Sequence, residues 1–88
     1  MRKIYKYDVT YGSMGDITGI FVADESEVAA AMGSHLYFGE ILGKHSEVSC
    51  DLEEEDIRAL TDDQAFIEKA LECGVVPCGY NPLVYISE

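Results

Sequence analysis

The first residues that could do chemistry are three cysteines and two histidines, which together could bind a metal ion. Zinc is usually held by two cysteines with two to four residues between them and by a second matching pair of ligands. Cys73 and Cys78 are within that range, whereas Cys50 is isolated and His35 and His45 fall at predicted strand and turn positions. We therefore predict no metal site and interpret the cysteines as free thiols that pack as small apolar side chains.

An acidic run at residues 51–56 has the spacing of the first half of a calcium-binding loop. An EF-hand loop needs oxygen ligands at its first, third and fifth positions and a glycine at the sixth. Asp51, Glu53 and Glu55 meet the first requirement, but Asp56 stands where the glycine is needed. The charged start of a helix explains the run more simply, so we predict no calcium site.

Two further patterns contain the residue types of an active site without the necessary arrangement. His45, Ser46 and Glu47 are the types found in catalytic relays, but neighbouring residues of a strand point to opposite faces. The Gly12–Gly15 segment resembles the start of a phosphate-binding loop, but no lysine follows and a hairpin turn needs the same glycines. We therefore predict that the chain is not an enzyme and binds no cofactor.

The acidic residues remain as the candidate functional group. The 88-residue chain has 17 acids against six lysines and arginines, which gives a formal net charge of −11. Residues 47–72 hold ten of the acids and two of the bases, whereas Arg2, Lys3 and Lys6 lie near the N-terminus. Such a surface repels nucleic acid and anionic membranes and favours a basic protein surface as partner. The alternative is that the acids only keep the protein soluble.

The densest acids are the four consecutive residues 53–56. On a helix that rises about 1.5 Å per residue, they would match the charge density of duplex DNA, which has one charge per ~1.7 Å. Tyrosines are frequent at interfaces because they combine apolar area with a hydrogen-bonding hydroxyl group. We predict a partner-binding site composed of Glu53, Glu54, Glu55, Asp56, Asp62, Asp63 and Tyr80.

An α+β fold is expected to position these residues. Residues 4–11 alternate as a strand does, a turn follows at Gly12–Asp16, and residues 17–22 form the second strand of a hairpin. A capping box from Asp24 to Glu27 starts a helix that stops at Gly33. Strands over residues 36–42 and 47–52 then form a second pair around a turn at Gly43 and Lys44.

The second half of the chain reads as mainly helical. We predict an acidic helix over residues 53–60, a second capping box at Thr61–Gln64, and a helix with an apolar stripe that ends at Gly74. Residues 75–82 read as a loop and residues 83–86 as a short edge strand. The order ββαββααβ predicts one antiparallel sheet of four to five strands with two to three short helices packed on one face, in a single compact domain over residues 1–88.

These observations predict a small acidic effector that binds another protein. Its most specific form is an inhibitor that covers the nucleic-acid-binding surface of a nuclease or defence complex by phosphate mimicry, of anti-restriction or anti-CRISPR type. In length and acidity the chain is similar to phage-encoded anti-defence proteins. Because the sequence has neither a signal peptide nor an apolar stretch of about 20 residues, we expect a cytoplasmic protein with no membrane partner. The alternatives are an interaction module or homodimer, and a small-ligand binder that uses the Gly12–Asp16 and Val75–Pro82 loops.

Overall fold

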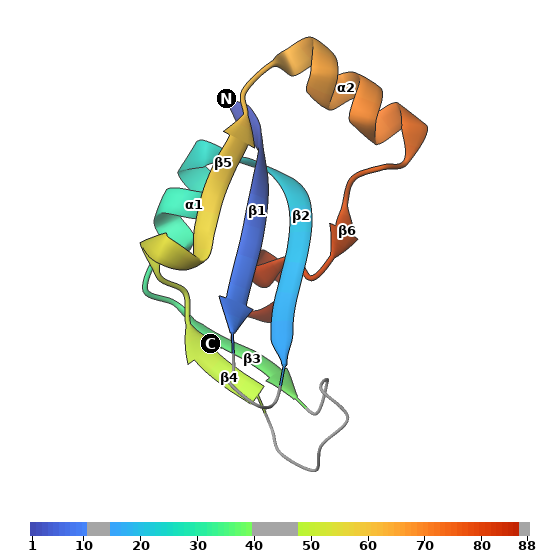
Figure 1. Cartoon of the computed structure of the whole chain (residues 1–88). Helices are drawn as coiled ribbons and strands as arrows, with labels where there is room; N and C mark the ends of the chain where they lie inside the picture. The colour runs from blue at the N-terminus through green and yellow to red at the C-terminus, as the bar shows by residue number, and fades with distance from the viewer. Residues whose placement is uncertain (11–14, 40–47, 87–88) are drawn as a thin grey trace.

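The computed structural model describes residues 1–10, 15–39 and 48–86, and its fold is α+β, as predicted (Figure 1). The described strands are β1 (Arg2–Thr10), β2 (Asp16–Asp24), β3 (His35–Gly39), β4 (Val48–Asp51), β5 (Ile57–Thr61) and β6 (Cys78–Gly79). The described helices are α1 (Glu25–Ala31) and α2 (Gln64–Cys73), with 3-10 turns η2 (Glu54–Asp56) and η3 (Pro82–Tyr85). The predicted turn at Gly43 and Lys44 and most of the turn at Gly12–Asp16 lie outside the described residues.

The β1–β2 hairpin is the centre of the fold, and it confirms the first predicted strand pair. The two strands are antiparallel and in register from Arg2 opposite Asp24 to Thr10 opposite Asp16. Since side chains alternate between faces, Tyr5 shares one face with its partner Phe21, and Lys6 shares the other face with its partner Ile20.

The predicted acidic helix over residues 53–60 is wrong. Only Glu54–Asp56 form one 3-10 turn, and residues 57–61 form strand β5, which pairs with β1. In β5, Ile57 lies opposite Tyr7 and is buried, whereas its neighbour Arg58 is exposed on the other face. The free edge of β1 and the burial of Ile57 outweigh the helix propensity of the acidic residues, because tertiary contacts routinely override weak local preferences.

The predicted antiparallel sheet of four to five strands is confirmed as a four-stranded sheet, but two of the described strands form a second, separate sheet. The first has four antiparallel strands in the order β5-β1-β2-β6, and the second is the β3–β4 pair. The second predicted pair is therefore confirmed as a pair, but it packs against the first sheet through Leu36 and Phe38 instead of joining it. Its register shifts between Tyr37 and Gly39, and Gly39 has a φ of 75°.

In the C-terminal segment, the predicted loop contains a strand and the predicted strand is a 3-10 turn. Residues 78–79, predicted as loop, form β6, in which Gly79 pairs with Gly19 of β2. The predicted edge strand over residues 83–86 is wrong, because Pro82–Tyr85 form η3, and Ile86 forms an isolated bridge with Leu36. The Asn81 side chain caps η3 by accepting a 3.0 Å hydrogen bond from the Leu83 N–H, and proline in the first turn favours that start.

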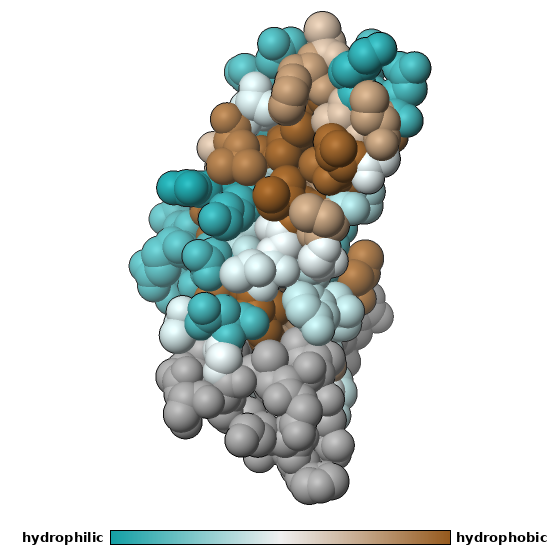
Figure 2. Space-filling model, turned by 45° about the vertical axis from the view of Figure 1, so that its right-hand side comes forward, coloured by the Kyte–Doolittle hydropathy of each residue, from teal (hydrophilic) through white to brown (hydrophobic). Residues whose placement is uncertain are grey.

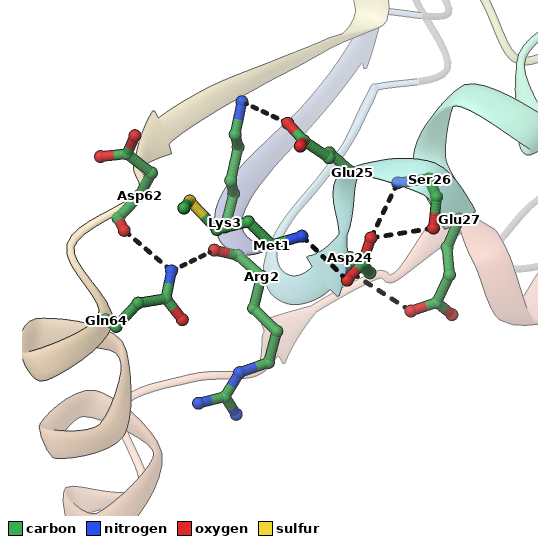
Figure 3. Close-up of polar contacts among 9 residues, drawn as sticks. All are labelled: Met1, Arg2, Lys3, Asp24, Glu25, Ser26, Glu27, Asp62 and Gln64. Carbon is green, nitrogen blue, oxygen red and sulfur yellow. Dashed lines mark hydrogen bonds and ion pairs between the residues drawn. The ribbon is translucent and has the colours of Figure 1, made fainter.

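Both helices begin at side-chain caps. Asp24 caps α1 and completes the predicted capping box with Glu27, and it also accepts a 3.1 Å hydrogen bond from the N-terminal amine (Figure 3). The cap of α2 is Asp63 instead of Thr61, and it accepts bonds from the N–H groups of Ala65 and Phe66. As predicted, α2 ends at Gly74, whose φ of 76° suits a residue without a Cβ atom.

The helices do not cover one face of the sheet, contrary to the prediction. α1, η3 and the β3–β4 pair cover the face that carries Tyr5, Tyr7 and Phe21, which we call the aromatic face. α2 covers part of the opposite face, where Ile67 and Ala70 pack against Ile4, and we call this the α2 face. Both faces of β1 therefore have apolar partners, because the strand has apolar residues at both odd and even positions.

Candidate functional site

The acidic residues 53–56, which we call the acidic loop, are held between two buried anchors. Leu52 precedes the loop with no exposed surface, and Ile57 follows it with 8% exposed. The backbone of Leu52 donates to the Ser34 carbonyl and accepts from the Gly33 N–H, each at 2.8 Å. Within the loop, the Asp56 N–H donates to the Glu53 carbonyl at 3.1 Å and closes the turn. The loop is therefore fixed at both ends, and the Asp56 carboxylate folds back to accept a 3.4 Å hydrogen bond from the Glu53 N–H.

The carboxylates of the acidic loop repel one another. Glu53, Glu54 and Glu55 are exposed and Asp56 is half-buried. A hydrogen bond with Glu55, and then the charge of Glu55, raise the pKa of the Glu53 carboxyl group above its ordinary value. None of the ion pairs in the described part of the chain involves this loop. A cation placed beside the loop would relieve this repulsion.

Asp62 and Asp63 are not part of the same cluster. They lie beyond the other end of β5, whose five residues span about 16 Å. Asp63 is occupied as the cap of α2. The Gln64 side chain donates to the Asp62 carbonyl at 2.8 Å and to the Arg2 carbonyl at 2.7 Å, which attaches this corner to β1 (Figure 3). The sequence-predicted set is thus divided into two acidic groups.

Tyr80 is separated from both acidic groups. It follows β6, at the edge of the four-stranded sheet opposite to β5. Its N–H donates to the Thr18 carbonyl at 3.0 Å, and its ring centre is 6.1 Å from that of Phe38 and 6.0 Å from that of Tyr85. Tyr80 is a half-buried member of the aromatic face, so it does not supply an apolar anchor next to the acidic loop.

Two basic residues that sequence reasoning did not include lie beside the acidic loop. Lys6 of β1 is directly opposite Arg58 of β5, and both line a hollow of about 200 Å³ with Asp8, Glu55 and Asp56. The sequence did not reveal that they lie together, because we predicted a helix, and not a strand beside β1, for the residues around Arg58. Like charges on opposite strand positions destabilise a sheet, but the carboxylates of Asp8, Glu55 and Asp56 line the same hollow and offset the repulsion between the two bases.

The other candidate residues form no reactive group in the described part of the chain. The Tyr7 hydroxyl lies 3.6 Å from the Cys50 sulfur, and His35 Nδ1 lies 2.9 Å from an Asp51 oxygen at the surface. No cluster of three or more His, Cys, Asp or Glu side chains among the described residues could hold a metal ion. His45 lies outside the described residues. Nor do the described residues include a helix with the length and apolarity to cross a membrane.

The α2 face has an apolar groove that sequence reasoning missed. Three side chains at its border are strongly exposed for their type, namely Leu60 at 44%, Phe66 at 55% and Val75 at 60%. Together they surround an open space of about 350 Å³ over the floor formed by Ile4 and Ile20. Figure 2 shows hydrophobic residues gathered in one area at the upper part of that view, with hydrophilic residues around it.

Comparisons with protein-family models, with curated proteins and with solved structures find no match to this chain.

Proposed function

We propose that this chain is a non-enzymatic protein-binding module that docks on a basic surface of a cytoplasmic partner through its acidic loop. The observation that carries the proposal is the exposure of Glu53, Glu54 and Glu55, which take part in none of the ion pairs among the described residues. Glu55, through a hydrogen bond and then through its charge, raises the pKa of Glu53. A fold that keeps such repulsion gains most from a cationic partner, because that partner removes the repulsion as it binds.

In its specific form, the partner surface is one that binds nucleic acid. A 3-10 turn rises about 2.0 Å per residue, so the loop carries one charge per ~2 Å, close to the one per ~1.7 Å of duplex DNA. The loop is a single turn, and Glu55 and Asp56 face the hollow that also contains Lys6 and Arg58. We therefore expect the partner to approach from the side of Glu53 and Glu54, away from Lys6 and Arg58.

The test measures binding of a fluorescein-labelled, arginine-rich 12-residue peptide by anisotropy, between about 50 and about 300 mM NaCl. Phosphate mimicry predicts binding that weakens steeply with salt and duplex DNA that competes for the same peptide. The double variant Glu53→Gln/Glu54→Gln should bind roughly three- to tenfold more weakly at low salt, since two charges leave the contact surface.

A matched control removes the same charge from elsewhere. Glu68 and Glu72 are exposed glutamates on α2, so Glu68→Gln/Glu72→Gln changes the net charge equally without altering the acidic loop. This control should lose less than twofold. Equal weakening by both double variants would mean that only net charge matters, and the acidic loop would then be rejected as the docking site.

A further inference from the structure

The groove on the α2 face has the size and lining of a small-ligand site. Its open volume of about 350 Å³ lies within the range of roughly 300–1,000 Å³ that is usual for such pockets. Thr61 is the one polar residue among those that line it, namely Ile4, Ile20, Leu60, Thr61, Phe66, Ala70, Val75 and Val76. An apolar chain placed there would cover side chains that are now in contact with water, which is favourable in proportion to the area covered.

The strand register places two bases at one end of this apolar floor. Lys6 is directly opposite Ile20 on β2 and directly opposite Arg58 on β5, and it lies two residues from Ile4 on the same face of β1. Residues opposite one another on antiparallel strands have Cα atoms about 4.5–5.5 Å apart. The basic groups of Lys6 and Arg58 are therefore within side-chain reach of the end of the groove.

Neither base is neutralised by an ion pair among the described residues. The nearest acids are Asp8 on β1 and Glu55 and Asp56 before β5, which line the neighbouring hollow. In chain order, Lys6 lies between Ile4 and Asp8, and Arg58 lies between Asp56 and Leu60. An anion at the end of the groove would thus meet the two bases before it meets any of these acids.

We propose that this groove binds a small carboxylate with an apolar chain. The chain lies over Ile4 and Ile20 beneath Phe66, and the carboxylate lies between Lys6 and Arg58. The two basic residues, which lie opposite each other on neighbouring strands, then share one counter-charge. Charged hydrogen bonds to a carboxylate are stronger than neutral ones, and they fix the direction in which the chain enters.

Charge favours a small carboxylate over a protein segment or a second copy of the chain as the occupant of the groove. A basic protein segment would bring its own cations next to Lys6 and Arg58. An acidic protein, or a second copy of this chain, would bring many negative charges toward a molecule of net charge −11. A small monoanion carries only one charge, and the strand register places Lys6 and Arg58 nearer to the groove than Asp8, Glu55 and Asp56. The site is separate from the acidic loop and does not depend on the proposed function.

The test is a titration of the ¹⁵N-labelled full chain with sodium octanoate below its micelle concentration, followed by amide chemical shifts. Octan-1-ol and octylamine, which have the same chain and a neutral or cationic head, are titrated in parallel. We expect saturable shifts centred on residues 60–61, 66 and 75–76. Octanoate should bind most tightly and octylamine most weakly, because the head group meets two cations.

Two matched pairs of variants test where the carboxylate and the alkyl chain of octanoate bind. Lys6→Gln/Arg58→Gln should weaken octanoate about tenfold and leave octanol unchanged, since one charged hydrogen bond supplies that much discrimination. Lys3→Gln, on the other face of β1, should change neither. Val75→Ser should weaken both ligands, whereas Val84→Ser, at a valine that is 72% exposed on η3, should weaken neither. Because Lys6 is half-buried and Arg58 is exposed, Lys6→Gln/Arg58→Gln is expected to fold.

Three results would overturn the proposal. The first is the absence of saturable binding of octanoate, and the second is equal binding of octylamine. The third is that the groove amides shift with protein concentration in the absence of ligand, which would assign the groove to a second copy of the chain. Each leaves the arginine-peptide measurement unaffected, so the two proposals can fail separately.

Discussion

The two faces of the β1–β2 hairpin differ in how completely they are covered. On the aromatic face, buried side chains run from Ile17 to Ala23 along β2, with contacts from α1, η3 and the β3–β4 pair. On the α2 face, only Ile4, Ile67, Ala70 and Val76 form the buried cluster, and the sheet beyond them carries polar residues. One sheet therefore has a full core on one side and a partial core on the other.

Because of this difference, one face of the hairpin supplies most of the stability and the other face remains accessible. Close packing on the aromatic face supplies most of the buried apolar area, which is the main stabilising contribution in a domain of this size. α2 is attached through few buried residues and through the Gln64 contacts with Arg2 and Asp62. Elements with few buried contacts open at lower free-energy cost than the rest, and binding regions are commonly found among them.

The largest effect is expected from matched truncations of the two cores. Ile17 and Ile67 are both isoleucines with no exposed surface, one on each face. Ile17→Ala should lower the free energy of unfolding by about 4 kcal/mol and Ile67→Ala by about 2 kcal/mol, because water can fill the space beside the open groove. Urea titration monitored by circular dichroism measures both, and equal losses would contradict the difference between the faces.

A second comparison adds one carbon to each face. A Cβ at Gly19 would collide with the backbone carbonyl of Tyr80, where β6 crosses close to β2. Gly19→Ala should therefore cost about 2 kcal/mol and expose the Tyr80 amide to hydrogen exchange. Val75→Ile adds one carbon at the groove and should change the free energy of unfolding by less than about 0.5 kcal/mol. If Gly19→Ala were tolerated as well as Val75→Ile, the aromatic face would not be tightly packed.

The smallest effect concerns the acid dependence of the corner where β2 meets α1. Hydrogen bonds from the Ser26 N–H and hydroxyl, and then from the N-terminal amine, lower the pKa of Asp24 to about 2. A carboxyl group whose pKa is lowered by folding stabilises the protein above its unfolded pKa of about 3.9, and this contribution is lost as the pH falls toward 2.

Asp24→Asn should therefore lose less thermal stability than the native chain between about pH 4 and pH 2. Asparagine retains the cap, so helix α1 is expected to form in this variant. Thermal unfolding at a series of pH values is the measurement, with Asp62→Asn as a control that removes an exposed carboxylate elsewhere. Parallel curves for Asp24→Asn and the native chain would show that Asp24 does not contribute.

Local signals in the sequence were enough for the hairpin, the α1 capping box and the end of α2. Alternation defined β1, the Asp24–Glu27 spacing defined the cap, and Gly74 defined the stop. These features depend on neighbours within a few residues, and sequence displays such neighbours directly. The exposure of the acidic loop was predictable for the same reason, because consecutive carboxylates are rarely buried.

The remaining features depend on contacts between distant segments. Residues 57–61 become a strand because β1 offers them an edge, and nothing within that segment indicates it. The position of Tyr80 on the aromatic face follows from the pairing of β6 with β2. The groove arises because α2 crosses one end of the sheet and leaves the rest uncovered. The position of α2 on the sheet depends on contacts with distant segments, and the apolar stripe of α2 does not reveal it.

Strand β5 pairs only with β1 in the described part of the chain, so its other side is an exposed edge. Such edges allow sheets of separate molecules to join, and proteins commonly protect them with charged side chains. Here acids lie at both ends of the strand, in the acidic loop and at Asp62 and Asp63, with Arg58 between them. These carboxylates repel the same edge of a second molecule and so protect the chain from aggregation through this strand.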